Sequence, residues 1–437
     1  MTISWIPAHS PVDTAAEMPP APAPTKLKVL HVITRLVAGA GGNTLMSATG
    51  MDKRRYETWI AGGPGGPLWP EARRAGIHVV ELPHLHREVS AVDDTRTLIE
   101  LVSLIRREHF AIVHVHSAKS GVLGRLAALY CRVPVVVYTL HGRDPWWPAP
   151  DGSVSQLSEA LPRTSRAFLT IERSLRATTD RFVAVAPSVA RDAVLARIAT
   201  PGKVDIAASA VDLESIPLSS PSWVRRELGV PPDAPLIGTV GRLVAQKAPL
   251  DFVRMAAEVA RRRPEARFVM VGDGELAGEV EGLARILGVP LLLTGYRPDA
   301  AQIAAAFDVF VISSLYEGVG RAVTEAMASG RPVVATAVDG VVDIVTPGAT
   351  GLLAAARDPS GLADGVNWML DHPTEAAQMG AQACDLVREL FSVSRMCATL
   401  DAVYSAALGL VPLEVPSPEA PPVVAWVATS SGSQASR

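Results

Sequence analysis

The sequence predicts an α/β protein made of two doubly wound domains that face each other across a cleft. Apolar runs of strand length alternate with longer helical segments, and this alternation runs through the chain twice. The 437 residues are also too many for one ordinary domain. Apolar strands separated by helices are typical of parallel sheets that are covered on both faces.

The first series of strands and helices predicts a domain over residues 26–208. Helices fit between most of its strands, for example at 92–108 and 119–131. A connection at 209–234 with several prolines separates this domain from the second series. The strands of the first domain are expected at 28–36, 58–63, 78–83, 111–117, 134–142, 181–186 and 203–207.

The second series predicts a domain over residues 235–390. Beyond the two domains, the ends of the chain, 1–25 and 412–437, are rich in proline, alanine and serine. Such segments bury too little apolar surface to fold, so we expect both to be disordered. The strands of the second domain are expected at 236–243, 266–274, 290–296, 309–313, 332–336 and 351–355.

The composition argues against several classes of protein. A net charge of −3 argues against general nucleic-acid binding, which usually leaves a basic excess. Three cysteines lie far apart without a CxxC spacing, so we expect reduced packing residues. No apolar run approaches the roughly 18 residues that span a bilayer, and the N-terminus lacks the apolar core of a signal peptide. These features favour a cytoplasmic protein.

Residues 308–336 carry the strongest indication of a binding site. The stretch reads DVFVISSLYEGVGRAVTEAMASGRPVVAT and predicts a buried strand, a turn, a helix and a second strand. Glu317 precedes the glycine-containing turn at 318–320, and Glu325 lies on the helix. Ligands of open parallel sheets bind at the carboxyl ends of the strands, and the exposed amides of a helix start attract anions. We therefore predict that this stretch binds an anion such as phosphate.

Cationic and glycine-containing loops follow other strands of the second domain. Arg242 and Lys247 come after its first strand. The forked donors of arginine and the point charge of lysine suit a diphosphate, although an ordinary solvated pair would look the same. Gly272 lies in a second tight turn at this edge. Tyr296 and Arg297 lie in a third, which is able to hold a base through its backbone and ring.

In the first domain, a glycine-rich loop follows the first strand. Gly41 and Gly42 in this loop would let a phosphate or a sugar approach the backbone closely. Taken alone, the loop is explained nearly as well by a tight turn. It is not a GxGxxG sequence, which argues against a nicotinamide-dependent dehydrogenase.

Histidines mark the ends of two strands in the first domain. His114 and His116 alternate on one strand and therefore point to the same face. A metal pair is conceivable, but no third ligand stands at a recognisable spacing. His116, at the strand end, is the better candidate for a ligand contact, and His114 is better explained as a core residue. His141 has a similar strand-end position and is a weaker candidate.

Together these segments resemble family 4 of the retaining nucleotide-sugar glycosyltransferases, which have the GT-B fold. In the second domain the resemblance rests on GRLVAQK, VGDGEL, TGYRPD and YEGVGRAVTEAMASGRPVVAT. In the first domain it rests on GAGGN, HVHSAKSGVLGRLAA, VVVYTLHG and TDRFVAVAPS. It covers roughly residues 28–408, and the segment 391–411 is similar to the closing helix that crosses back to the first domain in this fold.

The resemblance implies a role for each motif. Glu325 would hold the ribose of the donor, and Glu317 would contact the donor sugar. Arg242 and Lys247 would clamp the diphosphate in place of a metal ion, so we expect neither a metal nor a cofactor. The resemblance implies four catalytic residues: Glu317, His116, Arg242 and Lys247. The substrate-binding residues would be Gly41, Gly42, Arg242, Lys247, Gly272, Tyr296, Arg297, Glu317, Gly318, Val319, Gly320 and Glu325.

The partners implied are a UDP- or GDP-linked sugar donor and an unidentified acceptor. Between Gly142 and Asp180, aromatic and basic residues gather among apolar ones: Trp146, Trp147, Arg163, Arg166, Arg173 and Arg176. Such a segment can lie on an anionic membrane surface, and a solvated helix face explains it equally well. Peripheral membrane contact would fit a polyprenyl-linked sugar acceptor in surface polysaccharide synthesis.

The sequence departs from the family pattern at two places. SAVD stands at 209–212 where Asn-Gly-Val-Asp is frequent, and DGVVD stands at 339–343 where Gly-Gly-x-Pro-Glu is common. The second departure lies near the donor sugar and leaves the identity of that sugar open. Two alternatives remain: a nucleotide-sugar epimerase of the same fold, and a catalytically silent sugar-nucleotide-binding protein. The retaining motif block disfavours the first, and the intact glutamates and cations disfavour the second.

Overall fold

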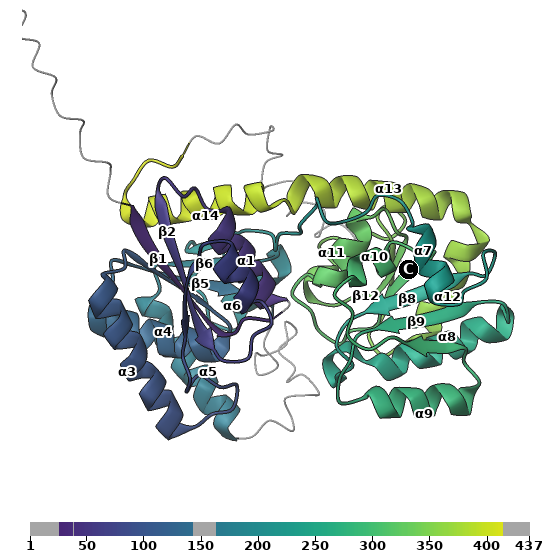
Figure 1. Ribbon diagram of the computed structural model, residues 1–437, viewed down its shortest axis with the longest axis horizontal. Helices are drawn as coiled ribbons and strands as arrows, with labels where there is room; N and C mark the ends of the chain where they lie inside the picture. Colours follow the sequence, from purple (N-terminus) through teal and green to yellow (C-terminus); the bar gives the residue numbers. More distant parts are fainter. Residues whose placement is uncertain (1–25, 38, 143–162, 414–437) are drawn as a thin grey trace, which may run out of the picture.

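The computed structural model describes residues 26–37, 39–142 and 163–413, and it contains two parallel sheets (Figure 1). The first sheet has the strand order β3-β2-β1-β4-β5-β6-β7. The chain winds outward from β1 in one direction and from β4 in the other, so the order reverses between these two strands. The strands are β1 (Leu27–Arg35), β2 (Tyr56–Gly63), β3 (His78–Glu81), β4 (Ile112–His116), β5 (Val135–Leu140), β6 (Arg181–Ala184) and β7 (Val204–Ile206).

The second sheet is also parallel and has the strand order β10-β9-β8-β11-β12-β13. Its reversal lies between β8 and β11. In doubly wound sheets the loops at such a reversal diverge and leave a crevice that binds ligands. The strands are β8 (Leu236–Val240), β9 (Arg267–Val271), β10 (Leu291–Leu293), β11 (Val309–Ile312), β12 (Val333–Thr336) and β13 (Leu352–Ala354).

Helices cover both faces of each sheet (Figure 1). They bury strands that are apolar on both sides, and this confirms the predicted fold class. In the first domain they are α1 (Ala40–Gly50), α2 (Trp69–Arg74), α3 (Ala91–Glu108), α4 (Ala118–Cys131), α5 (Arg163–Leu175) and α6 (Pro187–Leu195). In the second they are α8 (Pro249–Arg262), α9 (Ala277–Leu287), α10 (Ala300–Ala304), α11 (Arg321–Ala328), α12 (Pro359–Asp371) and α13 (Pro373–Leu390).

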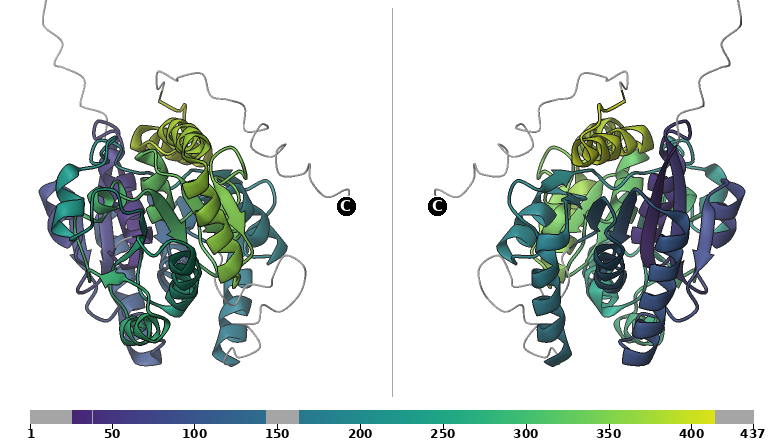
Figure 2. Two further views of the ribbon diagram at one scale, coloured as in Figure 1. Left: turned by 90° about the vertical axis from the view of Figure 1, so that its right-hand side faces the viewer. Right: turned by 90° about the vertical axis from the view of Figure 1, so that its left-hand side faces the viewer.

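The chain crosses between the two domains twice. The first crossing runs from Ile206 to Leu236 and contains the short helix α7 (Ser222–Glu227). The second begins at the end of α13, which packs on α11, and continues into α14 (Val393–Leu408), which packs on α1 and β5. Helices α13 and α14 lie together along one edge of the molecule (Figure 1 and, end-on, Figure 2).

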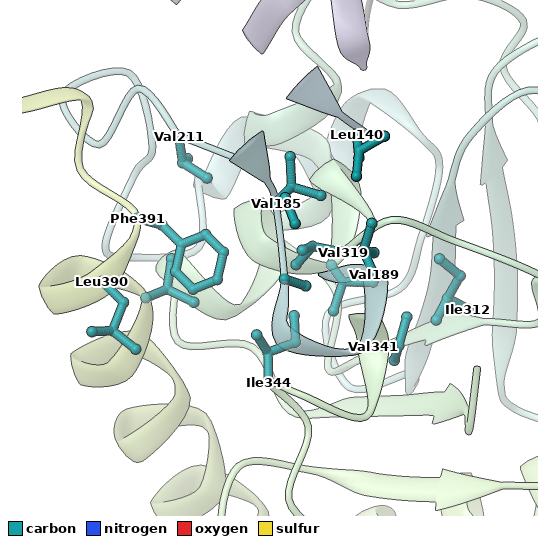
Figure 3. Packing of buried hydrophobic residues seen from close by; sticks show 14 of the residues in the cluster. Leu140, Val185, Val189, Val211, Ile312, Val319, Val341, Ile344, Leu390 and Phe391 are labelled. Carbon is teal, nitrogen blue, oxygen red and sulfur yellow. The ribbon is translucent and has the colours of Figure 1, made fainter. Parts of the chain in front are cut away.

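Apolar side chains from both domains meet in one buried cluster beside the carboxyl ends of the strands (Figure 3). Leu140 and Val185 come from the first domain, and Val319, Val341 and Ile344 come from the second. Each is almost completely withdrawn from solvent. Burial of apolar surface between the domains therefore favours this closed arrangement.

A hydrogen bond reinforces this domain contact. The carboxylate of Asp343 accepts from the backbone N–H of Ser188, in the first turn of α6, at 2.9 Å. A negative charge at the start of a helix is stabilised by the helix dipole. Burial nevertheless raises the pKa of Asp343. One of the residues that departs from the family pattern thus joins the two domains.

Candidate active site

The two crevices of the sheets face each other, and the backbone of one domain touches that of the other between them. The carbonyl oxygen of His141 lies so close to Gly318 that a Cβ at position 318 would collide with it. A Cβ on Gly142 would come within 3.1 Å of the backbone of Gly318. The site therefore has two walls, and glycine at position 318 is what allows them to approach.

The acidic turn after β11 places Glu317 in the wall of the second domain. Its side chain is buried and forms an ion pair with Lys247. The hydroxyl of Ser314 donates to the same carboxylate at 2.7 Å. The backbone N–H of Glu317 donates to Asp339 at 2.8 Å. Three residues therefore fix both the backbone and the side chain of this glutamate.

The loop that follows β8 brings the two expected cations to this turn. Hydrogen bonds dock the loop onto the residues after β11, because Leu315 N–H donates to the Gln246 carbonyl at 2.8 Å and the Gln246 amide donates to Tyr316 at 3.0 Å. Lys247 then reaches Glu317. Arg242 is more exposed and contacts only the side chain of Gln246 among described residues, at 3.5 Å. The guanidinium of Arg242 is thus available to an anion.

Helix α11 carries a second ion pair that faces the first domain. Arg321 Nε donates to Glu325 at 2.7 Å, one turn along the helix. The guanidinium lies beside Gly42, where a Cβ would collide with its Nη1. Arg321 therefore stands between the N-terminus of α11 and the N-terminus of α1, and both ends attract anions. The other carboxylate oxygen of Glu325 accepts no side-chain hydrogen bond from the described residues.

The two glycines of the first-domain loop have different surroundings. Gly42 faces Arg321 across the domain boundary, whereas a Cβ on Gly41 would lie 3.0 Å from the backbone of Leu36 in its own domain. Gly41 therefore allows the chain to turn from β1 into α1. Gly42 allows the second domain to approach that helix.

The tight turn at Gly272 lies beside the turn expected to hold the base, and Gly272 N–H donates to the Gly295 carbonyl at 2.9 Å. Tyr296 is 74% exposed, so its ring is accessible. Arg297 differs from expectation, because its guanidinium is held by Asp299 and Glu227 at 2.6 to 2.7 Å. It shapes the turn. Val319 also differs, since its side chain is part of the apolar contact between the domains.

The histidines are arranged differently from the prediction as well. His116 is completely buried, and both of its ring nitrogens are occupied by other histidines. Nε2 lies 3.0 Å from Nδ1 of His31, and Nδ1 lies 3.0 Å from Nε2 of His141. A direct contact of His116 with a sugar does not fit these bonds. His141, partly exposed beside Gly318, is the histidine of the first domain that borders the site.

A third histidine completes the cluster whose metal-binding capacity was considered above. His31, His114 and His116 each offer a ring nitrogen within 4.8 Å of the others. His114, however, already bonds Tyr404 and Thr139 at 2.6 Å through its two nitrogens. The geometry thus favours a hydrogen-bonded histidine cluster over a metal centre. As predicted for a core residue, His114 has no exposed surface.

Burial keeps this cluster uncharged. Removal from water lowers the pKa of His31 to about 3 and that of His141 to about 4. The pKa values of His114 and His116 are lowered as well, first by burial and then by the neighbouring histidines. At neutral pH each ring carries one proton.

Sequence reasoning missed three residues of this arrangement. Arginine at a helix start has no motif of its own, so the sequence does not single out Arg321, although its spacing from Glu325 predicts an ion pair. His31 lies in the middle of a strand, and only the pairing of β1 with β4 brings it to His116. Asp339 lies 22 residues after Glu317, and its hydrogen bond depends on how the chain returns through β12.

Two sheets with facing crevices, a pair of glutamates and a set of cations define a two-domain transferase that acts on a phosphate-linked donor. The chain belongs to glycosyltransferase family 4. Residues 38–215 match the family model described as Glycosyltransferase Family 4, and residues 234–372 match the model described as Glycosyl transferases group 1.

Curated relatives agree with this assignment. A UDP-Gal:alpha-D-GlcNAc-diphosphoundecaprenol alpha-1,3-galactosyltransferase of Escherichia coli is 28% identical over 342 residues, which are 76% of this chain and 85% of the relative. A D-inositol 3-phosphate glycosyltransferase of Actinosynnema mirum is 32% identical over 314 residues, which are 68% and 73% of the two chains. The prediction of a nucleotide-sugar glycosyltransferase is confirmed.

Solved structures show the same fold. Anabaena Alr3699/HepE in complex with UDP and glucose matches with a TM-score of 0.74 and 20% identity, over 87% of this chain and all of that chain. WaaG, a glycosyltransferase involved in lipopolysaccharide biosynthesis, matches with a TM-score of 0.69 and 16% identity, over 87% of this chain. The GT-B fold is thereby confirmed. Within the described ranges no helix is long and apolar enough to cross a membrane.

Proposed function

We propose that the protein transfers a hexose from a UDP-sugar, with retention of configuration, to a lipid-linked saccharide. The observation that carries the proposal is the buried Lys247–Glu317 pair beside Gly318, whose backbone meets the backbone of His141 from the first domain. A UDP donor is supported by the named activity of the Escherichia coli relative and by the UDP bound in the Anabaena structure. Retention is the stereochemistry of the family.

The diphosphate would lie between the N-termini of α1 and α11. Arg242, Lys247 and Arg321 would surround it, and two of these cations are held in ion pairs by glutamates of the site. Cations and helix dipoles fixed in this way stabilise the negative charge that grows on the leaving diphosphate. The protein need not supply a nucleophile for this reaction.

The sugar would lie between Glu317 and His141. As the glycosidic bond to the diphosphate breaks, an acceptor hydroxyl bonds to the anomeric carbon on the same face. Its proton passes to the departing phosphate oxygen. Glu317 would hold hydroxyls of the sugar, and the remaining oxygen of Glu325 would accept from the ribose. Bonds that fix both reactants in one orientation lower the entropic part of the barrier.

The acceptor would approach over the first domain, where apolar side chains are exposed on adjacent helices. Val92, Ile99 and Arg106 repeat every seven residues along one face of α3, and the two apolar residues are more than 60% exposed. The guanidinium of Arg106 stacks 4.8 Å from the ring centre of Tyr130 on α4, which is 64% exposed. Exposed apolar residues beside arginine suit the surface of an anionic membrane.

The membrane segment predicted from the sequence lies only partly within the described residues. Trp146 and Trp147 lie outside them, and for Arg163 and Arg166 only the backbone helix is described. Arg173 donates to the carbonyl of Ala196 at 2.9 Å and thus attaches α5 to the residues after α6. The support for membrane contact therefore comes from α3 and α4.

The donor is tested first, by thermal stabilisation with UDP-linked and GDP-linked hexoses. We expect stabilisation by a UDP-sugar, and stabilisation by GDP-sugars alone would contradict the UDP assignment. Transfer is then measured with polyprenyl-diphosphate-linked N-acetylglucosamine and with inositol 3-phosphate, the acceptor classes in the names of the two relatives. Transfer to inositol phosphate alone would replace the lipid-linked acceptor.

Membrane contact is tested by sedimentation with anionic liposomes at low salt. We expect the wild type to sediment and an Ile99→Ser, Tyr130→Ser variant to remain in solution. Ile286→Ser is the matched control, because Ile286 on α9 is 81% exposed but lies on the second domain. Equal sedimentation of the wild type and both variants, or no sedimentation of the wild type, would remove the support from α3 and α4.

A further inference from the structure

Three histidines form a continuous hydrogen-bonded line across the first sheet, which we call the histidine chain: His31, His116 and His141. They come from β1, from β4 and from the residue after β5, which are adjacent strands. The line runs from the buried interior to the strand ends, where the backbone carbonyl of His141 meets the second domain at Gly318. Nothing in the proposed transfer uses its inner members.

The protons of this chain have only two possible orders. Each neutral ring has one N–H and one acceptor nitrogen, and His116 uses both nitrogens inside the chain. Either His31 donates to His116 and His116 donates to His141, or both bonds run in the opposite direction. In the first order His141 carries its remaining N–H on Nδ1. In the second order Nδ1 of His141 is an acceptor.

The inner end of the chain distinguishes the two orders. Nε2 of His31 is buried and has no hydrogen-bond partner in the described part of the chain. If the bonds ran toward His31, this nitrogen would carry a buried N–H without an acceptor. Among backbone groups, buried N–H donors without a partner are rarer than acceptors that lack a donor, and we apply the same ranking to the imidazole nitrogens. If His31 instead donates from Nδ1 to His116, its Nε2 carries no proton, and no N–H is buried without an acceptor.

We propose that His31 is a positioning residue of the transfer reaction: its Nδ1–H orders the histidine chain so that His141 presents Nδ1–H to the ligand. The inference rests on the proposed function, because the donor must lie against His141. Nδ1 of His141 has no hydrogen bond to any described residue, and the side chain is partly exposed at the strand end. A neutral N–H there would bind an oxygen of the sugar or of the departing diphosphate, and would not accept from a hydroxyl.

The neighbouring His114 provides an internal comparison. It is equally buried on the same strand as His116, but it bonds Tyr404 and Thr139 and no member of the chain. Removing one of its bonds perturbs the same core without changing the order of protons in the chain. Tyr404→Phe is therefore the matched control for substitutions of His31.

The test combines nitrogen-15 NMR of the histidine rings with transfer kinetics on the full chain. In the wild type we expect His141 to be protonated at Nδ1. His31→Leu removes the fixed donor, so we expect mixed tautomers at His141 and roughly a 10-fold lower kcat with little change in the donor KM. His31→Asn offers an amide N–H at the place of Nδ1–H and should restore most of both readouts. Tyr404→Phe should change neither.

Several outcomes would overturn the inference. A wild-type His141 protonated at Nε2 would reverse the order. Equal loss of kcat in His31→Leu and His31→Asn, in proportion to lost thermal stability, would show a purely structural role. Stoichiometric Zn²⁺ binding that is lost in His31→Leu would show that the cluster is a metal site. The NMR result needs no substrate, so absence of transfer from any nucleotide sugar contradicts only the proposed function.

Discussion

The two walls of the site differ in kind. The wall from the second domain is charged, and its glutamates and cations hold one another in ion pairs. The wall from the first domain consists of neutral histidines and a glycine-rich helix start, and its polar groups continue into the core as a hydrogen-bonded cluster. The charged wall is suited to binding a diphosphate, and the neutral wall to orienting the groups that react.

This difference follows from what each wall must do. Charged side chains lose hydration when a site closes, and a partner of opposite sign offsets part of that loss. When a diphosphate binds, it can replace the glutamates as the partner of the cations, so the cations remain paired throughout. Neutral groups incur less desolvation, so the first domain can bury histidines completely and hold their orientation through packing.

The largest effect is expected from breaking the charged wall at Lys247. Lys247→Ala would remove a cation from the proposed diphosphate site, and it leaves Glu317 buried without its ionic partner. We expect kcat/KM to fall by about 10²- to 10³-fold, the cost of losing one fixed group that stabilises transition-state charge. Steady-state kinetics with the sugar donor that gives the largest thermal stabilisation would measure this loss.

Arg254→Ala is the control for that variant. Arg254 lies on α8 of the same domain and is about half exposed. Its ion-pair partner is Asp251, which is not a residue of the site. We expect nearly wild-type kcat/KM and an intact fold. A similar loss in both variants would show that general charge, and not the position of Lys247, supports the reaction.

A smaller loss is expected from breaking the neutral wall at its edge. His141→Ala removes one hydrogen bond to the sugar or diphosphate. A hydrogen bond to a charged group contributes about 1.5–3 kcal/mol, which corresponds to about a 10- to 100-fold loss. We expect the loss mainly in kcat, because this wall orients the reacting groups. Unchanged kinetics would mean that the charged wall alone carries the reaction.

The sequence predicts the charged wall better than the neutral wall, and the reason is physical. Glu317 and Glu325 lie within one short strand–turn–helix segment, and Arg242 and Lys247 lie within one loop, so local spacing is enough to identify each pair. The histidine chain depends on which strands are neighbours and on their register, and no short segment contains that information. His116 and His141 both end strands, and only the bonds in the core distinguish the buried one from the one at the boundary.

Substitution of Arg321 or Glu325 on α11 should reduce activity less than His141→Ala does, mainly through weaker binding of the donor. Glu325→Ala would remove the proposed ribose contact, and Arg321→Leu would remove a cation beside the proposed position of the diphosphate. We expect each to raise the donor KM roughly 10-fold. Because the two side chains bond each other, the double variant should lose less than the product of the single losses. Losses that simply multiply would show that the pair does not act as a unit.

The histidines of the neutral wall should also make the first domain sensitive to acid. Their pKa values are lower in the folded protein than in the unfolded chain, so the unfolded chain binds more protons as the pH falls below about 6.5. Stability is therefore lost as the pH falls toward 4, by about 1.4 kcal/mol per pH unit for each histidine.

Calorimetry between pH 7.5 and 5 measures this sensitivity. His31→Asn removes one of the titrating groups and should flatten the dependence of Tm on pH. Tyr404→Phe keeps all the histidines and should leave that dependence unchanged while lowering Tm. A wild-type Tm that stays constant over this range would contradict the burial of neutral histidines.

The smallest effect is expected from removal of divalent cations, which tests whether the charged wall is sufficient. Arg242, Lys247 and Arg321 would supply the positive charge that Mg²⁺ supplies in other phosphate sites. The carboxylates that would bind such an ion, Glu317 and Glu325, are each paired with a cationic side chain. Magnesium is held mainly through carboxylates and substrate phosphates, so pairing of both glutamates weakens a magnesium site. We therefore expect full activity in excess EDTA. Loss of activity that returns with added Mg²⁺ would mean that the glutamates exchange their partners for a metal, and the charged wall would then bind the diphosphate only together with that ion.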